Sequence, residues 1–85
     1  MSDRITVNVR LFATLKERAG VEQHTMQLNK GATVAEFKQQ LSEEFPGLPK
    51  ESSGMLVAVS QEYAFDEELI PPDVEIAVFP PVSGG

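Results

Sequence analysis

The amino-acid sequence predicts an α+β domain in which one main helix packs across one face of a mixed sheet of four or five strands. Apolar and polar residues alternate near the start of the chain, as in a strand with one buried face. Apolar residues then recur every three or four positions, as in a helix, and two short apolar runs follow. The order strand, strand, helix, strand, strand leaves a single main helix to cover the sheet.

The first strand is expected from Arg4 to Phe12. Its buried positions are Ile5, Val7, Val9 and Leu11. A short helical turn should follow from Ala13 to Ala19, because Gly20 is placed as a C-terminal stop. A second, less hydrophobic strand is expected from Val21 to Leu28, before the turn signal Asn29-Lys30-Gly31. Its composition favours an edge position in the sheet.

The main helix is expected to begin at a capping box. Thr33 and Glu36 have the spacing at which a hydroxyl and a carboxylate each satisfy an unpaired amide at a helix start. One apolar stripe then follows at spacings of three and four, formed by Val34, Phe37, Leu41 and Phe45. Pro46-Gly47 should end the helix.

The second half of the chain predicts three more strands. After a polar loop from Pro49 to Gly54, the apolar run from Met55 to Val59 has the length of a buried strand. A short strand is expected at Tyr63 to Phe65, and a last one, covered on both faces, at Val74 to Phe79. The turn Pro71-Pro72-Asp73 separates them. Residues 1–79 would thus form one domain with the element order of a ubiquitin-like β-grasp.

Composition restricts what such a domain can do. The 85 residues contain no cysteine, which excludes disulfides, thiolate metal sites and a cysteine nucleophile. A net charge of -6 argues against nucleic-acid binding and favours a basic protein partner. The longest apolar run is too short to span a bilayer, so we expect no membrane association and a cytoplasmic protein.

The remaining ionisable residues predict neither a metal site nor catalysis. His24, the one histidine, has no partner at the spacing of a metal site or a catalytic triad. It is expected to lie on the surface of a strand. The acidic cluster lacks the glycine and the ligand spacing of a calcium loop and is expected to be a solvated face that could steer a partner. Its members are Glu62, Asp66, Glu67 and Glu68.

The last six residues differ in composition from the rest of the chain. They are Pro80, Pro81, Val82, Ser83, Gly84 and Gly85. Adjacent prolines favour an extended, outward-pointing tail, which at full extension would reach about 20 Å. Two glycines could pass through a narrow channel, which makes the carboxylate of Gly85 the candidate reactive group. A frayed terminus without function is the alternative for a Gly-Gly end taken alone.

Three stretches carry a family resemblance that spans the whole chain. They are Leu11-Phe12-Ala13 with Gly20, Leu56 to Val59, and Glu75 to Gly85. Through them the sequence resembles the small subunit of molybdopterin synthase, the MoaD family of sulfur carriers. Departures are Asp73-Val74-Glu75, where a Gly-Asp-Glu turn is usual, and Ser60, where asparagine is common.

The resemblance implies a carrier that is not itself an enzyme and holds no permanent cofactor. A MoeB-like enzyme would use ATP to adenylate Gly85, and a sulfur donor protein would convert it to a thiocarboxylate. The tail would then enter the MoaE-like large subunit and give its sulfur to cyclic pyranopterin monophosphate, within a heterotetramer. By position, Phe12, Tyr63 and Phe79 correspond to the family's docking surface, with burial in the core as the alternative reading for all three.

Three other functions remain open at this stage. A sulfur carrier of another pathway, such as thiamin synthesis, shares the Gly-Gly end but usually lacks Pro80-Pro81. A ubiquitin-like modifier would join Gly85 to lysines of target proteins, which conjugates in cell extracts would reveal. A plain interaction domain would not need Gly84 or Gly85 at all.

Overall fold

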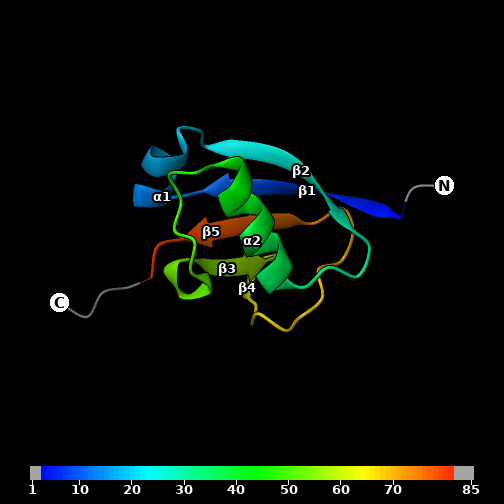
Figure 1. Ribbon diagram of the computed structural model, residues 1–85. Coiled ribbons are helices and arrows are strands. Elements are labelled where there is room, and N and C mark those ends of the chain that lie inside the picture. Colours follow the sequence, from blue (N-terminus) through cyan, green and yellow to red (C-terminus); the bar gives the residue numbers. More distant parts are fainter. Residues whose placement is uncertain (1–2, 82–85) are drawn as a thin grey trace.

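The computed structural model describes residues 3–81 (Figure 1). Their elements, in chain order, are β1 (Arg4–Leu11), α1 (Ala13–Ala19), β2 (Gln23–Asn29), α2 (Val34–Glu44), the 3₁₀ helix η1 (Ser52–Gly54), β3 (Leu56–Val59), β4 (Glu62–Tyr63) and β5 (Glu75–Phe79). This is the predicted α+β order, with five strands in one sheet.

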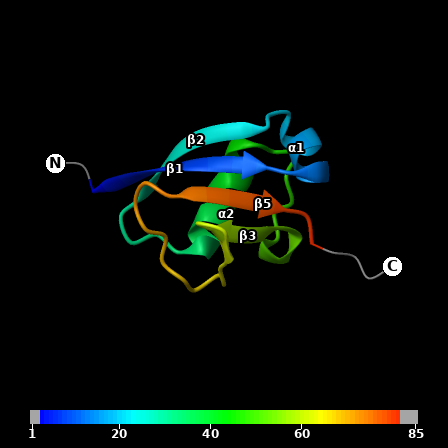
Figure 2. The ribbon, with the colours of Figure 1, turned by 180° about the vertical axis from the view of Figure 1, so that it is seen from behind.

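The sheet is mixed, and its strand order is β2-β1-β5-β3-β4. The two strands nearest the chain ends, β1 and β5, run parallel beside each other, while every other neighbouring pair is antiparallel. Figure 1 shows α2 lying across one face of the sheet, and Figure 2 shows that no helix lies across the opposite face. We call that opposite face the outer face; β2 lies at a sheet edge, as predicted.

The core lies between α2 and the sheet because each element buries one face. Along β1, burial alternates with the residues, and Val7 and Val9 are completely buried. The predicted stripe of α2 is buried at Val34, Phe37 and Leu41. From β5, Ile76 and Val78 complete the same core.

The predicted capping box fixes the start of α2. The amide of Glu36 donates to Thr33 Oγ1 at 3.2 Å, and the amide of Thr33 donates to Glu36 Oε1 at 2.9 Å. The loop before β5 satisfies two more helix-end amides, because the carbonyls of Glu68 and Asp66 accept from Val34 and Ala35. The helix start and this loop are thereby joined.

Several element boundaries differ from the prediction by one or two residues. The first strand ends at Leu11 because Phe12 is already the N-cap of α1. The second strand begins at Gln23 and not at Val21. The predicted stop at Gly20 is confirmed, with φ of 82° and its amide bonded to Lys16.

The third and fourth strands also shift. A 3₁₀ turn that the sequence did not predict occupies Ser52–Gly54, so β3 begins only at Leu56. The fourth strand is Glu62–Tyr63, because a two-residue turn already pairs Val59 with Glu62. Phe65, expected at the end of this strand, lies in the loop.

The last strand corrects another expectation, since the chain itself covers only one of its faces. Ile76 and Val78 are buried, whereas Ala77 and Phe79 on the outer face are only half-buried. α2 alone cannot cover both sides of the sheet, and α1 lies at its end (Figure 2). The outer face therefore remains available to solvent or to a partner.

Candidate functional site

The strand register places small and aromatic residues together on the outer face. Ala58 pairs with Ala77 across β3 and β5, and Tyr63 pairs with Ala58 from β4. On the other side, Ala77 pairs with Arg10 of β1. These side chains form one row across the sheet, because paired residues point to the same face.

A hollow of about 320 Å³ opens over the two alanines of this row. It is lined by Arg10, Phe12, Ala58, Gln61, Tyr63, Glu75, Ala77 and Phe79. The floor is low because alanine ends at Cβ, whereas the surrounding residues have long or aromatic side chains. We call this hollow and its lining the docking face.

Aromatic rings form the walls of the docking face. The rings of Phe12 and Phe79 are stacked, with centroids 4.8 Å apart and planes 11° from parallel, and Tyr63 lies 6.4 Å from Phe79. Tyr63 is 73% exposed and Phe12 is 37% exposed, so neither belongs to the core. The structure thus brings together all three residues predicted for the partner interface and excludes the reading that all three are core residues.

The docking face also carries one charge of each sign. Arg10 and Glu75 both line the hollow, but among residues 3–81 Arg10 forms no ion pair within 4.0 Å. Apolar surface with a few fixed polar groups is the composition of the centre of many protein–protein interfaces. The outer face thus has the features of a binding surface.

The tail begins at the rim of the docking face. Phe79 is the last residue of β5, and Pro80 and Pro81 follow it outside any regular element, with Pro81 exposed. The predicted modification site Gly85 and the tail residues Val82, Ser83 and Gly84 lie outside the described residues. A partner that contacts Phe79 would therefore lie next to the start of the tail.

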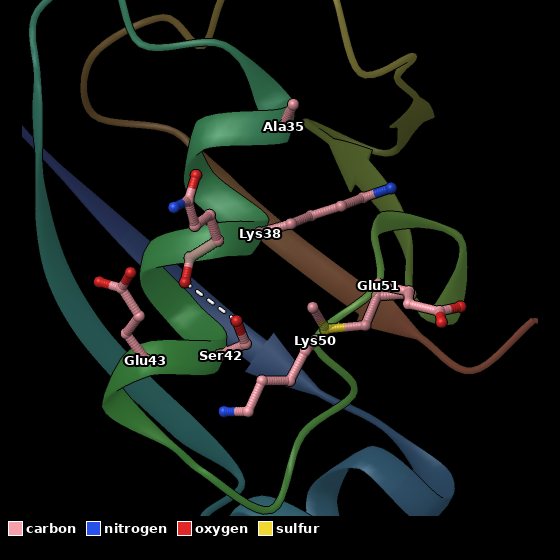
Figure 3. A pocket seen from close by; sticks show the side chains of 8 residues that line it. Ala35, Lys38, Ser42, Glu43, Lys50 and Glu51 are labelled. Atoms are coloured by element: carbon pink, nitrogen blue, oxygen red, sulfur yellow. Dashed lines mark hydrogen bonds between the residues drawn. The ribbon is translucent and has the colours of Figure 1, made fainter.

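A larger hollow, of about 430 Å³, lies on the other side of the molecule, between α2 and the loop before β3 (Figure 3). Its lining includes Lys38, Ser42 and Glu43 from α2 and Lys50 and Glu51 from the loop. The Lys38 ammonium is 2.8 Å from Asp66, and the Ser42 hydroxyl donates to the carbonyl of Gln39. Two of its polar side chains, Lys38 and Ser42, thus already have partners within the fold, and its lining contains no aromatic residue, which makes the docking face the better candidate.

The acidic cluster is only partly the solvated face that the sequence predicted. Glu62, Glu67 and Glu68 are exposed, but Asp66 pairs with the mostly buried Lys38 and Glu68 accepts from the amide of Phe65. Two of the four carboxylates therefore hold the loop in place. Within residues 3–81, no three potential ligands are grouped to hold a metal ion.

His24 makes contacts that stabilise the fold. Its Nε2 lies 2.8 Å from Glu44 Oε1, and its ring meets the ring of Phe45 edge-on at 4.9 Å. The Gln40 amide donates to the backbone carbonyl of Gln27 nearby, at 2.8 Å. These contacts tie the edge strand β2 to the end of α2.

Comparison with known proteins decides the family. The ThiS family matches residues 9–85, which is most of the chain. The chain belongs to the ThiS family.

Relatives of this ThiS-family chain agree with the resemblance predicted from the sequence. It is 32% identical to a protein from Arabidopsis thaliana named molybdopterin synthase sulfur carrier subunit, over 95% of this chain and 84% of the relative. A human protein of the same name is 34% identical, over 93% of each chain. Among solved structures, small archaeal modifier protein 1 from Haloferax volcanii is 30% identical with a TM-score of 0.80, over 94% of this chain and 99% of that one.

The structural match confirms the predicted β-grasp. No helix in the described part of this ThiS-family chain is long and apolar enough to cross a membrane. Sequence reasoning missed two features of the docking face: the hollow itself and the presence of Arg10 beside it. The alanines at positions 58 and 77 were the available signal, since small residues inside two apolar strands leave space on the sheet surface.

Proposed function

We propose that this chain is the sulfur carrier subunit of molybdopterin synthase and works in the cytoplasm as a substrate-bearing protein without catalytic groups of its own. The names of its relatives support the assignment. The docking face at the root of the tail is the structural observation that carries it. A carrier needs a surface that holds it on a partner while the end of its chain reacts, and the docking face includes Phe79, the residue directly before the tail.

The reaction proposed for Gly85 has two steps. In a MoeB-like enzyme, a carboxylate oxygen of Gly85 attacks the α-phosphorus of ATP, and pyrophosphate leaves. A sulfur donor protein then supplies hydrosulfide, whose sulfur bonds to the acyl carbon while the bond to AMP breaks, which leaves a terminal thiocarboxylate. Activation is needed because a free carboxylate has no good leaving group.

The second partner is a MoaE-like large subunit. Its active site would receive the tail, residues 80–85, and the thiocarboxylate would pass sulfur to cyclic pyranopterin monophosphate to build the dithiolene. A dithiolene contains two sulfur atoms, so we propose a heterotetramer with two carriers on a dimer of large subunits. Phe12, Tyr63 and Phe79 would anchor each carrier, because aromatic side chains dominate binding energy at interfaces.

The deciding experiment is the intact mass of the chain after incubation with ATP, a MoeB-like enzyme and a sulfur donor. We expect the gain produced by replacing one oxygen with sulfur. The matched control is the chain lacking Gly85, which should show no gain. An unmodified full-length chain, with an activating enzyme proven active on another carrier, would refute the proposal.

A second candidate is a ubiquitin-like modifier, favoured by the similarity to small archaeal modifier protein 1. The same acyl-adenylate could react with a lysine amine and form an amide. Tagged chain expressed in its own cells would then appear in larger covalent conjugates that vanish when Gly84 and Gly85 are removed. A thiocarboxylate without such conjugates would favour the carrier.

A further inference from the structure

Arg10 occupies a position that packing within the chain does not explain. It lies near the middle of the sheet, on the outer face of β1, with Ala77 on one side and Gln23 on the other. It is the one cation among the residues that line the docking face, all of which lie within residues 3–81. The surrounding lining is mostly aromatic and alanine, with Glu75 as its one carboxylate and Gln61 as its one amide.

The guanidinium of Arg10 forms no ion pair with the described residues. The Nε atom of Arg10 is buried and has no hydrogen-bond partner among residues 3–81. Buried donors of this kind are rare, because each one loses its bonds to water without replacement. Glu75 lines the same hollow without pairing with Arg10. An arginine without an ion pair on a binding surface indicates an acceptor that arrives with the partner.

We propose that the large subunit inserts a carboxylate side chain into the docking face, where it binds the guanidinium of Arg10. This rests on the proposed function. An arginine presents its donors in a planar fork that matches the two oxygens of a carboxylate. The aliphatic part of the inserted side chain would lie over Ala58 and Ala77, and the hollow of about 320 Å³ has room for it.

Two observations favour a protein carboxylate over a small multiply charged anion. The lining of the hollow is largely apolar, so it offers a phosphate few donors beyond one arginine. Glu75 adds a negative charge to the same lining, which disfavours a dianion more than a single carboxylate. The chain as a whole is acidic, at -6, and Arg10 would be the local exception that selects an acidic group.

The test compares the affinity of the purified large subunit for four chains by titration calorimetry, at low and at high salt. Arg10→Met keeps an unbranched side chain and removes the charge. Arg10→Lys keeps the charge without the planar fork. Arg4→Met is the matched control, because Arg4 lies on the same strand and the same face but outside the docking face.

We expect Arg10→Met to weaken binding at least about tenfold, because it leaves the partner's carboxylate unpaired, and to change the salt dependence of binding. Arg10→Lys should recover part of the loss, and Arg4→Met should change the dissociation constant by less than about twofold. Urea unfolding of each variant checks that the fold is intact. If Arg10→Met does not fold, the affinity of Arg10→Lys at low and at high salt tests the proposal alone.

Three outcomes would overturn the inference. If Arg10→Met binds as tightly as the unaltered chain or more tightly, while Tyr63→Ala weakens binding, then no partner carboxylate binds Arg10. The proposed function would be unaffected by this result. Competition by inorganic phosphate that depends on Arg10 would assign the site to a small anion. If the unaltered chain neither binds the large subunit nor gains sulfur, the proposed function fails and this inference fails with it.

Discussion

At the scale of single residues, burial distinguishes the aromatic side chains that stabilise the core from those that do not. Phe37 is completely buried in the core, whereas Tyr63 and Phe65 are more than 70% exposed. Exposure of a large ring to water has a free-energy cost that folding alone does not repay. Tyr63 borders the hollow and Phe65 does not.

This contrast gives a matched pair of variants. Tyr63→Ala should weaken association with the large subunit at least about tenfold, because aromatic anchors at the centre of an interface carry much of its energy. Phe65→Ala, two residues further along, should leave the affinity nearly unchanged. Titration of each variant with the purified large subunit measures both. Equal effects of the two changes would show that Tyr63 does not anchor the partner.

A second residue-scale prediction concerns the cap of α2. Thr33→Ala removes the hydroxyl that accepts from Glu36, and should lower the free energy of unfolding by about 1 kcal/mol. Urea titration followed by circular dichroism measures the change. Thr14→Ala on the exposed side of α1 is the control and should have little effect, since alanine favours helices. Similar losses in both variants would contradict a specific role for the cap.

At the scale of elements, residue patterns predicted most of the structure and the turns caused most of the errors. The alternation in β1, the stripe of α2 and its capping box were all read correctly, because each depends on neighbours in the sequence. The two-residue turn Ser60-Gln61 was not recognised, because it lacks the Asn-Gly signal of such turns. Both residues have positive φ, 51° and 74°.

This turn predicts a stabilising change. A glycine at position 61 adopts positive φ without steric cost, so Gln61→Gly should raise the free energy of unfolding by about 1 kcal/mol. Gly31→Ala provides the opposite control, because Gly31 has φ of 86° and open space around it, and it should lower stability by a similar amount. Urea midpoints measure both. A loss of stability in Gln61→Gly would show that its side chain contributes more than its backbone strain costs.

At the scale of the whole molecule, one face of the sheet is buried in the core and the other, which carries the docking face, is not covered by a helix. The sequence predicted the three aromatic residues of the docking face through family resemblance, but it could not show that they converge. Phe12, Tyr63 and Phe79 lie far apart along the chain, and only the pairing of β5 with both β1 and β3 brings them together. The hollow was missed for the same reason, since Ala58 and Ala77 become neighbours only in this register.

A substitution that fills the hollow should reduce partner binding without reducing the stability of the fold. Ala77→Leu adds bulk on the outer face and should leave the free energy of unfolding within about 1 kcal/mol, because surface substitutions are usually mild. Binding of the large subunit should fall at least about tenfold, because an inserted side chain would clash. Thr6→Leu, exposed on the outer face of β1 outside the hollow, is the control and should bind normally. Normal binding by Ala77→Leu would show that the hollow stays empty in the complex.

The central position of β5 has a consequence for how the molecule is made. β5 lies between β1 and β3, so neither of these strands has its full set of hydrogen bonds until residues 75–79 have left the ribosome. Pairing the first strand with the last also closes nearly the whole chain into one loop, which slows folding relative to local pairing. A chain that stops short of β5 would lack both the middle of its sheet and Phe79. Interrupted synthesis would therefore yield an unfolded chain for the cell to degrade, and not a folded domain that lacks only its last residues.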